Sequence, residues 1–213
     1  MESFDSPDFR RVLLEADLVT PDGMPVVWSL RLTGDRRATR VYGPDLTLLI
    51  LEAAAREGLP VGFYGASPAT LGKLAARLTR RFPALHISCL HAPPFRPLTP
   101  EEDERAVMEI ENSRTRILFV GLGAPKQERW MAAHRGRIPA VMIGVGAAFD
   151  FHAGTKPQAP RWMQRAGLEW LFRLSAEPRR LAPRYLRQNP RFLVLFAREL
   201  LRLRRQPKFT LTS

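Results

Sequence analysis

Short apolar runs alternate with longer amphipathic segments along most of the chain. The apolar runs are rich in β-branched and aromatic residues, which favours strands, and the amphipathic segments repeat apolar residues every three to four positions, which favours helices. The apolar runs predict strands at Ala16–Val19, Val61–Tyr64, His86–Leu90, Ile117–Val120 and Ala140–Val145. The amphipathic segments predict helices near Pro25–Leu32, Pro44–Glu57, Pro68–Arg81, Pro100–Asn112 and Pro125–His134.

The strict alternation of strand and helix predicts an α/β fold, with a doubly wound, mostly parallel sheet and helices on both faces. Each predicted helix opens at a proline, which suits the first helical turn. An acidic run follows Thr99, and the spacing of Thr99 and Glu102 predicts a capping box at the helix start. The other carboxylates of that run favour the positive end of the helix dipole, so we assign them no catalytic chemistry.

Positive charge is concentrated at one end of the chain. Residues 156–213 carry fourteen Lys and Arg against three Asp and Glu, and therefore hold +11 of the net charge of +12. Length and apolar content suit one domain with a full core. We therefore predict an α/β core in residues 1–155 and a basic helical appendage in residues 156–213. Such a charge excess indicates an anionic partner: nucleic acid, an acidic membrane surface or a phosphorylated substrate.

The appendage is also amphipathic between Pro190 and Arg205. A helical wheel separates an apolar face from a basic one, as in helices that lie on a membrane surface. The apolar stretch Phe192–Ala197 is far shorter than the roughly 20 residues that span a bilayer. The alternative is a terminal helix that packs on its own domain. The apolar face holds Phe192, Leu193, Phe196, Leu200 and Leu203, and the basic one holds Arg191, Arg198, Arg202 and Arg205.

Cysteine content and the N-terminal sequence bear on the compartment. A single cysteine, Cys89, allows no internal disulfide and lies in an apolar run that favours the core. The first residues lack a basic region followed by an apolar one, so we expect no signal peptide. Together these features favour the cytoplasm.

Three turns that follow predicted strands carry candidate ligand-binding residues, because ligands of doubly wound sheets bind beyond the carboxyl ends of the strands. Thr20–Pro25 contains Asp22 in a Pro/Gly-rich turn, and Gly121–Glu128 and Gly146–Phe151 are glycine-containing. Neither glycine run completes the GxGxxG fingerprint, and the phosphate-binding GxxxxGK[ST] motif is absent from the sequence. By spacing alone, each glycine could simply shape a turn.

Several segments resemble one family of glycosyltransferases. They are ADLVTPDGMPVVW, RVYGPDL, GLGAPKQERWM, GVGAAFDFHAGT and APRWMQRAGLEWLFRLSAEPRRL, in this order along the chain, and the overall match runs from about Ala16 to Leu195. The chain is thereby similar to the WecG/TagA/CpsF, or N-acetylmannosaminyltransferase-like, family. The resemblance implies an inverting transferase that moves a sugar from a UDP-sugar to a polyprenyl-diphosphate-linked sugar at the cytoplasmic membrane face. Family products feed teichoic acid, enterobacterial common antigen, capsule or exopolysaccharide assembly.

The resemblance implies two catalytic residues. Asp22 matches the family's catalytic aspartate, and a carboxylate can take the proton from the attacking acceptor hydroxyl. Arg40, in the matching RVYGPD segment, would stabilise the charge on the departing diphosphate. From the residues alone, a turn or cap role is favoured for Asp22, and a surface ion-pair role for Arg40. The sequence lacks a DxD motif, so we expect no metal cofactor.

The remaining candidates are substrate-binding residues implied by the matching segments. Gln127 and Asp150 would line the nucleotide-sugar pocket, with Asp150 at the ribose hydroxyls. Arg173, Arg180 and Arg184 would reach the active site or lipid phosphates, although a basic solvated face is an equal alternative. We expect His152 to neighbour the site without taking part, because no carboxylate partner is evident. The matching segments also contribute Gly43, Asp45, Gly123 and Glu128, and Gly65, directly after the predicted strand Val61–Tyr64, is a further candidate.

The chain departs from the family pattern in three places. We expect the family's N-terminal strand with its Thr/Asn motif to be missing, since this chain begins with what resembles the following helix. His91–Phe95 replaces a usual His-Gly-Tyr-Phe, and Gln158 stands where Arg often precedes Ala-Pro. These departures bear on donor and acceptor preference.

Two other functional classes fit parts of the sequence. A nucleic-acid-binding protein could use the basic tail with its interleaved Trp170, Phe172, Tyr185 and Phe192. However, the sequence lacks RNP, KH and zinc-knuckle patterns, so we expect no nucleic-acid partner. An NAD-linked enzyme is disfavoured by the incomplete glycine pattern. The expected partners are a UDP-sugar, a polyprenyl-diphosphate-linked acceptor and an anionic membrane surface, and a homo-oligomer is compatible with the sequence.

Overall fold

The computed structural model describes residues 1–205. Residues 206–213, and the side chains at positions 180, 184 and 203–205, lie outside the described residues. Contacts divide the chain into two units. The sheet unit consists of residues 2–19 and 42–158, and the helical unit of residues 20–41 and the chain from 159 onward, together with Met1.

The sheet unit is built on four parallel strands. They are β1 (Val61–Gly65), β2 (Ile87–His91), β3 (Ile117–Gly121) and β4 (Val141–Gly144), in the order β2-β1-β3-β4. The predicted parallel α/β sheet is thereby confirmed, and four of the five predicted strands lie within a residue or two of their expected places.

The prediction of a strand at Ala16–Val19 is wrong. This segment follows a short helix as irregular backbone, and the Leu18 and Val19 side chains are 80% and 57% exposed. A strand in a parallel sheet is stabilised by burial on both faces, which this segment lacks. A run of four residues interrupted by Asp17 carries too little apolar surface to decide its own conformation.

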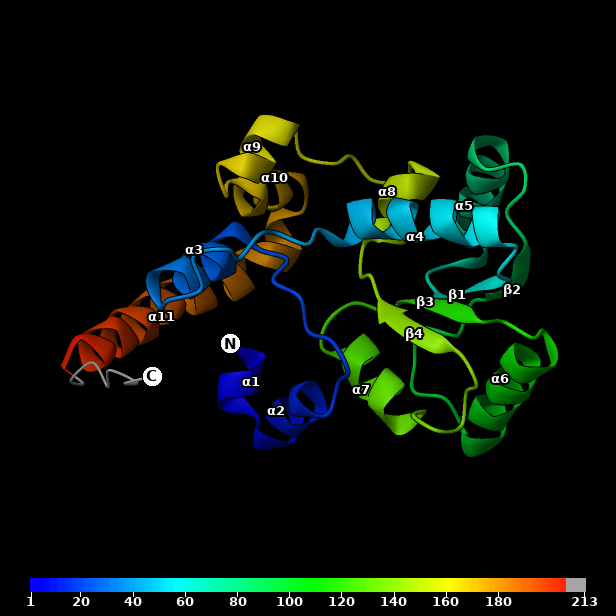
Figure 1. Ribbon diagram of the computed structural model, residues 1–213, viewed down its shortest axis with the longest axis horizontal. Coiled ribbons are helices and arrows are strands. Elements are labelled where there is room, and N and C mark those ends of the chain that lie inside the picture. Colours follow the sequence, from blue (N-terminus) through cyan, green and yellow to red (C-terminus); the bar gives the residue numbers. More distant parts are fainter. Residues whose placement is uncertain (206–213) are drawn as a thin grey trace, which may run out of the picture. The chain divides into compact units, whose positions relative to one another are not determined.

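Helices cover both faces of the sheet (Figure 1). On one face lie α4 (Gly43–Glu57), α5 (Pro68–Arg81) and α8 (Ala148–Ala153), and on the other α6 (Pro100–Asn112) and α7 (Lys126–Ala133). The first core contains Phe63, whose ring stacks on Phe119 at 5.3 Å and meets Phe149 edge-on at 5.5 Å. The second contains Tyr64 and the buried thiol Cys89. Phe63 and Tyr64 are neighbours on β1, and neighbouring strand residues point to opposite faces of a sheet. Each face therefore carries its own apolar core, which helices cover.

Local signals fix several helix starts. The predicted capping box is confirmed: Thr99 N–H donates to Glu102 Oε2 over 3.0 Å, and Glu102 N–H donates to Thr99 Oγ1 over 3.3 Å. Two short helices, α1 (Glu2–Asp5) and α2 (Pro7–Leu14), precede the sheet. The second one buries Phe9, whose ring lies 5.5 Å from the Arg129 guanidinium of α7.

The helical unit contains α3 (Met24–Leu32), α9 (Arg161–Arg165), α10 (Glu169–Ala176) and α11 (Pro178–Arg205). Residues 20–41 therefore group with the C-terminal segment, a division that differs from the predicted boundary at residue 155. The reason is tertiary packing: a side chain at Gly167 would collide with the Trp28 ring of α3. The helix expected from Pro190 begins earlier, at Pro178, and continues through Pro183 and Pro190.

Among residues 1–205, none of the helices combines the length and apolar content that a membrane crossing requires.

Candidate functional site

In the sheet unit, the Gln127 side chain ties the turn after β3 to the turn after β4. Gln127 is the second residue of α7 and is only 6% exposed. Its Oε1 accepts a hydrogen bond from Gly146 N–H over 3.0 Å, and its Nε2 donates to Glu128 Oε1 over 3.0 Å. A Cβ at Gly144 would lie 2.8 Å from Gln127 Nε2, so any side chain there would require this amide to shift. The carboxyl ends of two adjacent strands are thus fixed by one side chain.

Two carboxylates lie at the same ends of the strands. The Oε2 atom of Glu128 is buried and has no hydrogen-bond partner within the described part of the chain. An unsatisfied buried acceptor is costly, and such a group calls for an explanation such as a ligand or water. Asp150, in α8, accepts a hydrogen bond from the Thr155 hydroxyl over 3.0 Å and lies 3.5 Å from Lys156 Nζ. Asp150 therefore anchors the loop that follows α8.

The other candidates of the sheet unit have mainly structural surroundings. Gly43 and Asp45 form the first turn of α4, and Gly123 has a φ of +77° in the turn before α7. Gly65 ends β1 with a φ of +123°, and a Cβ there would lie 2.7 Å from the Gly121 carbonyl oxygen. Its lack of a side chain therefore allows two strand ends to approach closely.

His152 also has a structural contact. Its Nε2 lies 2.9 Å from the Pro44 carbonyl oxygen, and burial lowers the pKa of the imidazole. Both observations agree with a neutral histidine that supports the start of α4.

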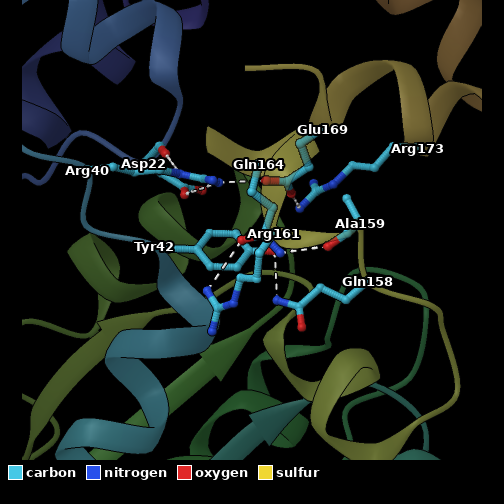
Figure 2. A network of polar contacts seen from close by, with 9 residues as sticks. All are labelled: Asp22, Arg40, Tyr42, Gln158, Ala159, Arg161, Gln164, Glu169 and Arg173. Carbon is cyan, nitrogen blue, oxygen red and sulfur yellow. Dashed lines mark hydrogen bonds and ion pairs between the residues drawn. The ribbon is translucent and has the colours of Figure 1, made fainter. Parts of the chain in front are cut away.

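In the helical unit, an ion-pair cluster joins the Asp22 turn to α10 (Figure 2). The Arg40 guanidinium donates to the Asp22 backbone carbonyl through Nε, and its Nη2 lies 3.3 Å from Asp22 Oδ1. The same Nη2 lies 2.6 Å from Glu169 Oε2. Arg173, one helical turn after Glu169, donates to the other oxygen, Glu169 Oε1. Four charged side chains thus form a connected chain of alternating sign.

Burial differs along this cluster. The side chains of Arg40 and Glu169 are 15% and 13% exposed, whereas that of Asp22 is 63% exposed. The protein around Asp22 partly desolvates its carboxyl, which raises the pKa of Asp22; the Glu169 charge acts in the same direction, and Arg40 and Arg173 oppose it. A solvent-accessible carboxyl with a raised pKa, held beside a guanidinium, has the properties of a general base next to an anion-binding group.

Of the sequence-predicted candidates, the structure brings together Asp22, Arg40 and Arg173 in the helical unit. It links Gln127 with Glu128 in the sheet unit. The backbones of Arg180 and Arg184 belong to α11, but their side chains lie outside the described residues. Sequence reasoning missed Glu169, for which the spacing of Glu169 and Arg173 on one helix was the available signal. In residues 1–205, no three His, Cys, Asp or Glu side chains gather as a metal site requires.

Comparison with known proteins supports a common origin over nearly the whole chain. The model of the glycosyl transferase WecG/TagA/CpsF family matches residues 1–206. The chain is also similar to the N-acetylglucosaminyldiphosphoundecaprenol N-acetyl-beta-D-mannosaminyltransferase of Bacillus spizizenii. The two are 33% identical over 181 residues, which cover 84% of this chain and 68% of the relative.

Proposed function

Because the chain belongs to the WecG/TagA/CpsF family of glycosyltransferases, we propose that it transfers an N-acetylmannosamine-like hexose from a UDP-sugar to a polyprenyl-diphosphate-linked sugar. The name of the Bacillus spizizenii relative supports this choice, since it specifies an N-acetylmannosaminyl group and a diphosphoundecaprenol-linked N-acetylglucosamine. The product would serve the assembly of a cell-surface polysaccharide or teichoic acid.

The observation that carries the proposal is the contact of Asp22 with Arg40. In an inverting transfer, the acceptor oxygen forms a bond to the anomeric carbon while the bond from that carbon to the diphosphate breaks. Asp22 would take the proton of the acceptor hydroxyl, a role that its raised pKa favours. Arg40 and Arg173 would stabilise the negative charge that the departing UDP gains.

The sheet unit would supply the nucleotide pocket. The turn-bridging amide of Gln127 and the buried Glu128 oxygen without a partner among the described residues support this assignment. Asp150 would bond the ribose hydroxyls, and Gly123 would let a phosphate approach the backbone. The remaining proposed contacts are Gly43, Asp45, Gly65, Arg180 and Arg184.

We also propose that the enzyme works without a metal, since guanidinium groups can neutralise a diphosphate and the sequence lacks a DxD motif. It would act at the cytoplasmic face of the membrane, on which α11 would lie. The exposed apolar side chains of Leu186, Leu193 and Leu201 on that helix support such a contact.

A transfer assay tests the proposal. The protein is incubated with UDP-N-acetylmannosamine and a short-chain polyprenyl-diphosphate-linked N-acetylglucosamine, with and without EDTA, and products are identified by mass spectrometry. We expect a lipid-linked disaccharide and released UDP in both samples. A product that forms only when Mg²⁺ or Mn²⁺ is restored would overturn the metal-free step. Calorimetry that shows binding of NAD or single-stranded RNA, but not of UDP or UDP-sugars, would overturn the function.

A further inference from the structure

We propose that Glu169 is a positioning residue, which holds Arg40 and Arg173 side by side so that both guanidinium groups meet the charge of the leaving diphosphate. The inference rests on the proposed function. It assigns a role to a residue that the sequence analysis does not single out as a candidate.

Glu169 bridges the two arginines with its two oxygens. Oε2 lies 2.6 Å from Arg40 Nη2, and Oε1 accepts from Arg173 Nη2. Arg173 comes from the same helix, whereas Arg40 comes from a segment 129 residues earlier in the chain. One carboxylate therefore connects the Asp22 turn with α10, and it does so inside the helical unit.

The bridge is needed because two guanidinium groups repel each other. With the Arg40 and Arg173 side chains only 15% and 37% exposed, solvent screens that repulsion less than it would between fully exposed groups. A carboxylate between the two cations offsets the repulsion by attracting both, and it orients each guanidinium. A guanidinium carries five N–H donors in a planar fork, so a carboxylate on one edge can orient the group while another anion bonds a second edge.

The substitution Glu169→Gln tests this role, because it keeps the shape and one oxygen acceptor but removes the charge. Deleting a donor to a transition-state charge costs roughly 10²–10³-fold in kcat. Loss of positioning alone should cost less, and we expect kcat to fall about 10-fold to 100-fold. The Glu169 charge raises the pKa of Asp22, so its removal should also move the acidic limb of the pH–rate profile to lower pH. Glu169→Asp keeps the charge and should leave that limb near its parental place.

A matched control is Asp103→Asn in the sheet unit. The Asp103 carboxylate also bridges two basic side chains, with Oδ1 2.9 Å from His134 Nε2 and Oδ2 2.9 Å from Arg137 Nη1. Its loss should lower the thermal unfolding midpoint but leave the acidic limb in place. If Glu169→Gln behaves in the same way, Glu169 is merely structural.

The outcomes separate this inference from the proposed function. If Asp22→Asn is inactive while Glu169→Gln keeps the parental kcat and pH profile, the positioning role is overturned and the proposed function stands. If Asp22→Asn is fully active, the assignment of the base fails, and the inference fails with it. If circular dichroism shows that Glu169→Gln does not fold, Glu169→Asp provides the test, because its side chain is one methylene shorter. If this variant keeps both the parental kcat and the parental acidic limb of the pH–rate profile, exact placement of the two cations is not needed, and the positioning role is overturned.

Discussion

At the residue scale, the chemistry proposed for Asp22 depends on how its carboxyl is surrounded. Partial desolvation and the nearby Glu169 charge favour the protonated form, whereas Arg40 favours the ionised form. The net effect raises the pKa of Asp22, which makes the carboxylate a stronger base than an ordinary aspartate. Because a base must be deprotonated to act, activity should be present above the raised pKa and be lost as the pH falls through it.

The corresponding prediction concerns Asp22→Asn. An amide cannot accept the acceptor hydroxyl's proton, so we expect transfer to slow by roughly 10²–10⁴-fold while UDP binding is kept. The parent enzyme should lose activity on acidification at a pH above the ordinary aspartate pKa of 3.8, and the residual activity of the variant should lack that limb. Steady-state rates and UDP calorimetry measure both effects. Asp17→Asn, which changes a carboxylate that is 92% exposed, serves as the control.

The four residues of the ion-pair cluster differ in how readily the sequence alone predicts them. Asp22 and Arg40 lie in segments that resemble a family motif, so the sequence alone is enough to propose both. The Glu169 and Arg173 pair follows from helical spacing. The contact of Arg40 with Glu169 could not be predicted, because a pairing across 129 positions is set by tertiary packing rather than by local pattern.

At the element scale, proline positions and apolar periodicity located the helices well. Helices α5 and α6 have the predicted bounds, and α3, α4 and α7 begin within one residue of expectation. Local signals suffice there because a first-turn proline and an apolar stripe act within one element. The failure at Ala16–Val19 has the opposite cause: whether a short apolar run forms a strand depends on neighbours that lie elsewhere in the chain.

A prediction at this scale concerns the contact of β4 with α7. Gly144→Ala would place a methyl group 2.8 Å from Gln127 Nε2 and push the amide away from Gly146 N–H. Overpacking of this kind costs typically about 1–3 kcal/mol, so the unfolding free energy should fall and UDP-sugar affinity with it. Chemical denaturation and calorimetry measure the two losses.

The control for that substitution is Gly72→Ala within α5. An added Cβ there meets no atom within 4 Å, and alanine favours a helix interior over glycine by roughly 0.5–1 kcal/mol. Gly72→Ala should therefore be stabilising or neutral. If Gly144→Ala were equally harmless to stability and to binding, the bridging amide of Gln127 would have no part in donor recognition.

At the scale of the whole molecule, the main feature that folding does not explain is the excess of positive charge in residues 156–213. Charge predicts a partner rather than a structure, so the sequence could indicate an anionic surface without showing which segments group together in the fold. Residues 20–41 join the C-terminal segment through contacts between distant side chains, such as Arg40 with Glu169, which composition does not reveal. The described part of α11 exposes apolar Leu193 and Val194 next to basic side chains.

We predict that this helix binds anionic membranes. The variant with Arg187, Arg198 and Arg202 all changed to Glu removes three exposed cations of α11. Each cation near an acidic leaflet contributes about 1 kcal/mol, so vesicle affinity should fall at least about 100-fold. Co-sedimentation with phosphatidylglycerol–phosphatidylcholine vesicles measures the effect. Salt should weaken binding of the parent, because exposed charges are screened over a Debye length of about 10 Å at 0.1 M.

The matched control reverses three exposed arginines of the sheet unit, Arg56, Arg80 and Arg105, and so changes the net charge by the same amount. If binding depends on where the cations lie, this variant should sediment with vesicles almost as the parent does. Equal loss in both variants would mean that only net charge matters, and equal sedimentation of all three proteins would mean that α11 is a packed helix without a membrane role. A protein that retains RNA more tightly than vesicles at the same salt would instead be a nucleic-acid binder, because counterion release from a phosphate backbone would then supply the affinity.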